Sequence, residues 1–158
     1  MSRKFLVKTV PSIWIEHNSR RLDCGPYVSG AIEAKELLNQ IPARKDRLQD
    51  LTEGGVSGII NPGRITRLWV SDEQHGYPFL SSTDILQADL SNISHIAKSV
   101  ARQNRQLLIR DHWTLITRSG TIGRTVYSRT EMSGMACTED VLRVIPDESK
   151  VKPGYIYA

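Results

Sequence analysis

The part of this sequence best suited to binding a charged ligand is the stretch 118–124, which reads Arg-Ser-Gly-Thr-Ile-Gly-Arg. Glycine permits a positive φ or the close approach of another backbone. The hydroxyls of Ser119 and Thr121, with the flanking Arg118 and Arg124, are donors suited to phosphate. The stretch lacks the Gly-Lys-Ser/Thr ending of a P-loop, and its single Gly-x-x-Gly falls short of a dinucleotide-binding motif. Two interpretations stay open: a tight hairpin that needs glycine for its backbone, and a contact with a nucleic-acid backbone.

Residues of catalytic types are present, but their spacing does not favour catalysis. Asp147, Glu148 and Lys150 supply the letters of a metal-dependent nuclease signature, yet they share one predicted turn, whereas such carboxylates must converge on a metal from separate strands. The four histidines are scattered without a zinc-site spacing, and no Gly-x-Ser-x-Gly elbow supports a nucleophilic serine. Cys24 and Cys137 are too few for a disulfide scaffold, so we expect reduced thiols. We therefore expect a non-catalytic chain with no metal and no cofactor of its own.

Positive charge is concentrated in one part of the chain. The whole sequence has 21 Lys and Arg against 17 Asp and Glu, a net charge of +4. Between Lys98 and Arg129 there are seven basic residues and one acidic residue, Asp111, so this segment carries +6 and the remainder −2. A modest overall excess does not identify a nucleic-acid-binding protein, but one basic segment in an otherwise slightly acidic sequence is typical of a surface that meets a polyanion.

The elements that must position these residues follow from apolar periodicity and β-branched runs. Helical spacing predicts helices, and β-branched or aromatic runs predict strands. The helices are expected over residues 26–39, 44–51 and 94–102, and the strands over residues 4–10, 107–109, 113–117, 125–127 and 141–145. Phe79 and Trp113 lie inside apolar runs, so we expect them in the core. We predict an α/β fold of the α+β type: a twisted, mainly antiparallel sheet flanked by the N-terminal helices, in a single domain over residues 1–158.

The end of the sequence begins another apolar element. Residues 153–158 read Pro-Gly-Tyr-Ile-Tyr-Ala and stop without a polar tail, so we expect the start of a following helix and an N-terminal fragment of a longer protein. No apolar run approaches the roughly 20 residues of a membrane span, and no signal peptide is recognisable. The expected location is the cytoplasm.

Four stretches, taken together, resemble the target recognition domain of the specificity subunits of type I restriction-modification systems. They lie in the order and at the spacing of that family: residues 21–27, 76–85, 115–124 and 140–158. The third stretch is the most specific. The sequence departs from the family at residues 110–113, where Arg-Asp-His-Trp replaces the usual Gly-Asp turn. It also contains one recognition domain where the full subunit has two separated by long helices.

The resemblance implies that the chain reads one half of a split duplex DNA sequence from the major groove. It would hold a methyltransferase subunit that flips and methylates an adenine, while a separate motor-nuclease subunit cuts unmodified DNA. S-adenosylmethionine, Mg²⁺ and ATP would belong to those partner subunits, and the cell would be bacterial or archaeal.

Residue types select the candidate DNA contacts, because phosphates are bound by basic side chains and small hydroxyl or backbone donors, and arginine can pair with guanine. The candidates are Arg64, Arg67, Ser81, Ser82, Thr83, Lys98, Arg118, Ser119, Gly120, Thr121, Arg124 and Arg129. The alternatives are a recognition domain fused to its methyltransferase, a protein-interaction module whose basic surface meets an acidic partner, and, last, a metal nuclease using Asp147 and Glu148.

Overall fold

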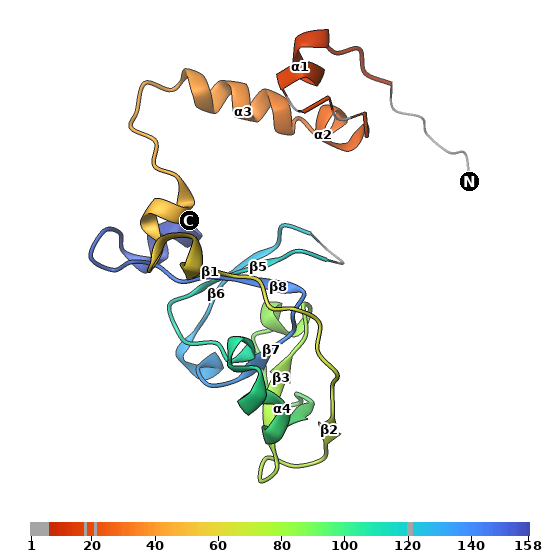
Figure 1. Cartoon of the computed structure of the whole chain (residues 1–158), viewed down its shortest axis with the longest axis vertical. Coiled ribbons are helices and arrows are strands. Elements are labelled where there is room, and N and C mark those ends of the chain that lie inside the picture. The colour runs from red at the N-terminus through yellow and green to blue at the C-terminus, as the bar shows by residue number, and fades with distance from the viewer. Residues whose placement is uncertain (1–6, 18, 21, 120–121) are drawn as a thin grey trace. The chain divides into compact units, whose positions relative to one another are not determined.

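Contacts along the chain divide the protein into two units, Met1–Lys45 and Asp46–Ala158. The computed structural model describes residues 7–17, 19–20, 22–119 and 122–158. The first unit contains only helices among its described residues, and both β-sheets lie in the second (Figure 1). A small mixed fold with two sheets and few helices confirms the predicted α/β class.

The first unit contains α1 (Ser12–His17), α2 (Gly25–Val28) and α3 (Ala31–Gln40). The single helix predicted over residues 26–39 is wrong, because Gly30 has a φ of +78° and breaks the helical path between α2 and α3. The predicted strand at residues 4–10 lies partly outside the described residues, and residues 7–10 have no regular secondary structure.

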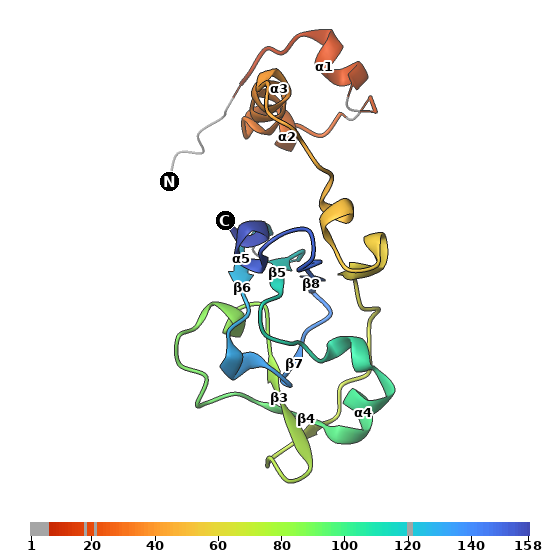
Figure 2. The same ribbon diagram turned by 90° about the vertical axis from the view of Figure 1, so that its left-hand side faces the viewer.

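The first sheet of the second unit is entirely antiparallel and has the order β1-β8-β5-β6 (Figure 2). Its strands are β1 (Ile59–Ile60), β5 (Thr114–Thr117), β6 (Thr125–Tyr127) and β8 (Val141–Val144). The last three confirm strands predicted from the sequence. In the register of the two central strands, Leu115 lies opposite Arg143.

The second sheet has the order β2-β4-β3-β7. Its strands are β2 (Trp69–Val70), β3 (Gly76–Leu80), β4 (His95–Ala97) and β7 (Ala136–Cys137). The pair β3–β7 is parallel and the other pairs are antiparallel. The prediction of one sheet is therefore wrong, because three of these strands have only two or three residues and leave little periodic signal in the sequence.

Short helices precede, connect and follow the strands of the second unit. They are η1 (Leu48–Leu51), η2 (Gly55–Gly58), η3 (Asp84–Leu86), α4 (Lys98–Gln103), η4 (Arg105–Leu107), η5 (Thr130–Met132) and α5 (Pro153–Tyr157). Three predictions need correction. The helix at 44–51 is only the 3₁₀ turn η1, the one at 94–102 begins as strand β4, and residues 107–109 make a single bridge, Leu108 with Ala136, instead of a strand.

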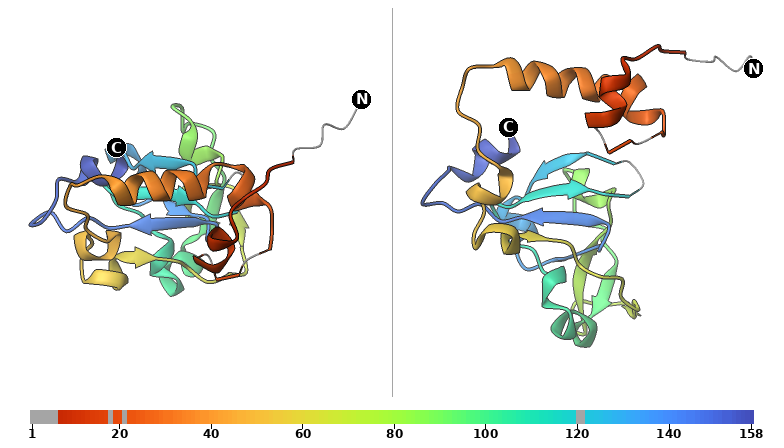
Figure 3. Two further views of the ribbon diagram at one scale, coloured as in Figure 1. Left: turned by 90° about the horizontal axis from the view of Figure 1, so that it is seen from above. Right: turned by 45° about the horizontal axis from the view of Figure 1, so that its top comes forward.

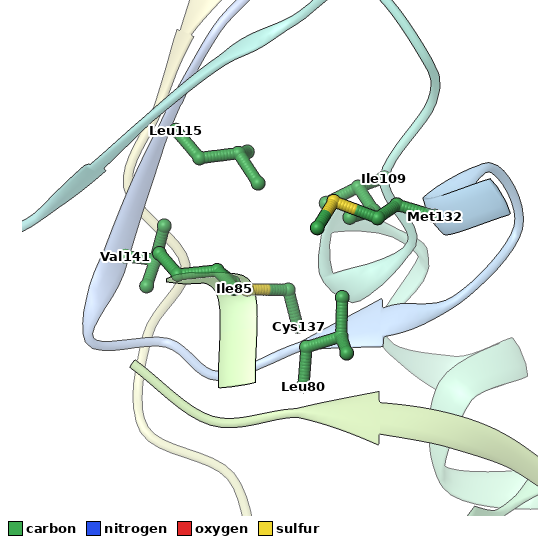
Figure 4. Packing of buried hydrophobic residues seen from close by; sticks show 7 residues of the cluster. All are labelled: Leu80, Ile85, Ile109, Leu115, Met132, Cys137 and Val141. Carbon is green, nitrogen blue, oxygen red and sulfur yellow. The ribbon is translucent and has the colours of Figure 1, made fainter. Parts of the chain in front are cut away.

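One hydrophobic cluster joins the two sheets (Figure 4). Its buried members are Leu80, Ile85, Ile109, Leu115, Met132, Cys137 and Val141. A second cluster lies where α4 packs on β3 and β4, with Phe79 buried as predicted and Trp113 half-buried against the first cluster. Both sheets contribute residues to this core, so the loops at their ends are attached to strands that pack together.

Candidate nucleic-acid interface

The predicted loop at residues 119–123, with Arg118 and Arg124 on either side, is the connection of the β5–β6 hairpin, at one end of the first sheet (Figure 3). Hydrogen bonds among its described residues include Thr117 N–H to Arg124 O and Gly123 N–H to Thr117 O, both 2.9 Å, and Arg124 N–H to Thr117 Oγ1, 3.0 Å. Gly123 has a φ of +83°, which explains the glycine. Ser119 is half-buried and Ile122 is 75% exposed, while Gly120 and Thr121 lie outside the described residues.

Arg118 and Arg124 flank this loop and are both exposed. The Arg118 Nε donates to Glu139 O at 3.1 Å, and its backbone N–H donates to Asp140 O at 2.9 Å. This anchoring orients the guanidinium, whose two terminal nitrogens make no hydrogen bond with another described residue. The Arg124 guanidinium has no hydrogen bond or ion pair within the described part of the chain. The hairpin therefore presents one oriented and one free cation.

Three other basic candidates are held by contacts inside the protein. Arg67 Nη2 donates to Glu139 Oε2 at 2.9 Å and to Thr138 Oγ1 at 3.1 Å. Arg129 Nη2 donates to Gln87 O at 3.1 Å. Lys98 Nζ donates to Gln74 O at 2.8 Å. These contacts give all three side chains structural roles in joining separate segments, so they are weaker candidates for DNA contacts than Arg118 and Arg124.

The predicted surface around residues 81–83 forms a local cap. Ser81 Oγ accepts hydrogen bonds from the N–H groups of Thr83 at 3.3 Å and Asp84 at 3.2 Å, while Ser81 N–H donates to Asp84 Oδ2 at 2.8 Å. This reciprocal arrangement has the hydrogen-bond pattern of a capping box, in the turn that leads into η3. Ser82 is half-buried and Thr83 is exposed. Ser81 therefore serves the local backbone.

A second basic grouping was not singled out in the sequence. Arg102, Arg105 and Arg110 line one hollow of about 800 Å³, with Tyr77 and Trp113. The candidate Arg64 lines a neighbouring hollow of about 320 Å³, which also contains Arg105. The only sequence signal for the grouping is the basic segment itself, because nothing in the spacing of these arginines predicts that they meet Tyr77 and Trp113.

Asp147, proposed above as a nuclease carboxylate, is engaged in its own turn. Its Oδ1 accepts a hydrogen bond from the Ser149 hydroxyl, and its Oδ2 lies 3.1 Å from Lys150 Nζ. These hydrogen bonds, that from the Ser149 side chain first, lower the pKa of Asp147. Within the described residues, no three His, Cys, Asp or Glu side chains are grouped so that they could hold a metal ion.

Among the described residues, no helix combines the length and apolar character needed to cross a membrane. A scan against models of protein families and a search of curated proteins found no match to this chain.

Proposed function

We propose that this chain recognises a specific duplex DNA sequence as the specificity component of a type I restriction-modification complex. The observation that supports this proposal best is the β5–β6 hairpin, which carries the exposed Arg118 directly after β5 and the exposed Arg124 directly before β6. In this proposal the chain does no chemistry. A methyltransferase subunit and a motor-nuclease subunit supply the activities, with S-adenosylmethionine, Mg²⁺ and ATP bound to those partners, in the cytoplasm of a bacterium or archaeon.

The geometry of a two-stranded hairpin suits the major groove. A groove about 12 Å wide admits a β-ribbon, and arginine pairs with the O6 and N7 acceptors of guanine through two parallel hydrogen bonds. Arg118 fits that contact, because its Nε is anchored on Glu139 O and its two terminal nitrogens are free of hydrogen bonds to the other described residues. An oriented guanidinium loses less side-chain entropy on binding. Arg124 has no such anchor and is suited to a phosphate.

The test is selection from a pool of random DNA duplexes by the whole wild-type chain at two salt concentrations. We expect enrichment of related sequences and weaker binding at the higher salt concentration, because bound phosphates release counterions. Arg118→Ala should relax the selected sequence at one position, whereas Arg124→Ala should weaken binding to all sequences.

The control variant is Arg47→Ala. It removes an equal charge from an exposed arginine beside η1, and η1 adjoins the Ile145 end of β8, whereas the hairpin loop adjoins the Val141 end. If no sequence is enriched and binding does not depend on salt, the proposal is refuted. Salt-sensitive binding of a protein from the same cell, with no preference among DNA sequences, would indicate an interaction module instead.

A further inference from the structure

The hollow lined by Arg102, Arg105 and Arg110 lies at the opposite end of β5 from the hairpin loop. Trp113, which precedes the first residue of β5, lines it, whereas the loop begins after Thr117. Arg102 lies near the end of α4, Arg105 begins η4, and Arg110 follows three residues after η4 ends. It is therefore a separate surface from the one proposed to read DNA.

The backbone that carries these arginines is fixed by buried contacts. Asn104 Nδ2 donates to Val100 O at 2.9 Å where α4 ends, and Leu107 and Ile109 are fully buried. Ile109 N–H donates to Met135 O at 3.0 Å. The arginine side chains project from this anchored segment and are exposed. Arg102, Arg105 and Arg110 form no ion pair with any described carboxylate, so their charges are available to a ligand.

Ser128 holds the segment between Arg110 and Trp113 in place. Its buried Oγ accepts a hydrogen bond from Trp113 N–H at 2.8 Å, and its hydroxyl donates to Arg110 O at 2.7 Å. His112 N–H donates to Ser128 O at 2.9 Å, with a His112 φ of +64°. This left-handed residue reverses the chain, so that Arg110 and Trp113 line the same hollow.

The composition of the hollow identifies the chemistry of its ligand. The lining of the hollow contains three arginines and one carboxylate residue, Glu53, so its formal net charge is +2. Guanidinium matches phosphate with two parallel hydrogen bonds. The lining also contains two aromatic side chains, Tyr77 and Trp113, and the apolar residues Leu108, Ile109 and Ile145. Aromatic and apolar side chains do not stabilise an inorganic anion, whereas a nucleobase stacks on aromatic rings.

We infer that this hollow binds a nucleotide, with its phosphate on Arg102, Arg105 and Arg110 and its base against Trp113 or Tyr77. Its volume of about 800 Å³ lies within the range of small-molecule sites, about 300–1,000 Å³. The same chemistry is present in a free nucleotide and in an unpaired nucleotide of a nucleic-acid strand. The inference goes beyond the proposed duplex recognition, since it uses a different surface.

The experiment is titration calorimetry of the whole chain with ATP, with inorganic phosphate and with a single-stranded oligothymidylate. We expect ATP or the oligonucleotide to bind more tightly than inorganic phosphate. Arg105→Ala and, separately, Arg102→Ala should each weaken that binding by about tenfold, the loss expected for one charge-assisted hydrogen bond. Both side chains are exposed, so these variants should keep the fold. Arg47→Ala and Arg124→Ala are the controls that remove the same charge elsewhere.

The pattern of results distinguishes the two sources of nucleotide and the two proposals. Tighter binding of ATP than of the oligonucleotide indicates that the ligand is a free nucleotide. Tighter binding of the oligonucleotide indicates an unpaired nucleotide of a strand. Equal affinity for inorganic phosphate and ATP, or no effect of Arg105→Ala and Arg102→Ala, would overturn the inference. If duplex binding depends on Arg124 while no nucleotide binds, the proposed function stands and this inference fails. If nucleotide binding depends on Arg105 while no duplex binds, the reverse holds.

Discussion

Replacement of Arg143 should destabilise the second unit more than any other arginine substitution discussed above. Arg143 lies in β8 and its side chain is fully buried. Its guanidinium donates to Thr138 O at 3.0 Å and Leu107 O at 3.4 Å, and to the carbonyls of Cys137 and Val141. Cys137 and Val141 belong to β7 and β8, Thr138 lies between these strands, and Leu107 belongs to η4, so one side chain ties separate segments together. Arg143→Ala therefore leaves up to four carbonyl groups without this donor.

The magnitude follows from two opposing effects. Each hydrogen bond from a charged donor contributes about 1.5–3 kcal/mol, which for four bonds sets an upper limit of about 6–12 kcal/mol. Burial lowers the pKa of Arg143 because the charged guanidinium is removed from water, and removing an ion from water costs several kcal/mol. Their difference gives a loss of about 4 kcal/mol, out of a total stability of about 5–15 kcal/mol for a domain.

Urea unfolding followed by circular dichroism measures this loss. With a slope of about 2 kcal/mol per molar urea, the midpoint of Arg143→Ala should fall by about 2 M. Arg143→Lys should lie between wild type and Arg143→Ala, because an ammonium keeps the charge but has three donors instead of five. Arg47→Ala should leave the midpoint unchanged. A loss below about 1 kcal/mol for Arg143→Ala, at an unchanged slope, would refute the reasoning.

Two further predictions concern Arg67 and Cys137. Arg67→Ala should lower the free energy of unfolding by about 1–2 kcal/mol, because it leaves Glu139, whose side chain is 9% exposed, without its ion pair. Its DNA affinity should change less than that of Arg124→Ala. A larger loss of DNA affinity in Arg67→Ala would contradict a structural role for Arg67. Burial raises the pKa of the Cys137 thiol from 9.0 to about 11, so at pH 8 a thiol reagent should label only the exposed Cys24 in the folded chain. Because the thiol of the unfolded chain loses its proton at a lower pH than the buried thiol, the free energy of unfolding should fall by about 2–3 kcal/mol between about pH 9 and 11. Cys137→Ala, compared with its own stability at pH 8, should not show this loss.

The strongest local signals in the sequence predicted the first sheet. The β-branched runs of β5, β6 and β8 are long enough to show as strands, and Phe79 lies in the core as its apolar neighbours indicated. Strands such as β2 and β7 could not be predicted, because two residues carry no period and their pairing is fixed by tertiary contacts.

The basic segment could be predicted, but the role of each arginine could not. Arg67 and its partner Glu139 are 72 residues apart, so only the fold reveals that this charge is neutralised. Arg143 reads as an ordinary charged residue in a strand, yet it is fully buried. The stretch 118–124 was found because glycine, hydroxyl and arginine residues are adjacent in the sequence, whereas the hollow around Arg105 combines residues from Glu53 to Ile145.

The most direct test of duplex recognition by the β5–β6 hairpin is the salt dependence of binding to one selected duplex. The logarithm of the association constant should fall linearly with the logarithm of salt concentration, and Arg124→Ala should reduce that slope by about one, the contribution of one phosphate contact. Arg47→Ala should leave the slope as in wild type. A slope near zero for the wild-type chain, or an Arg124→Ala slope equal to that of wild type, would contradict the account.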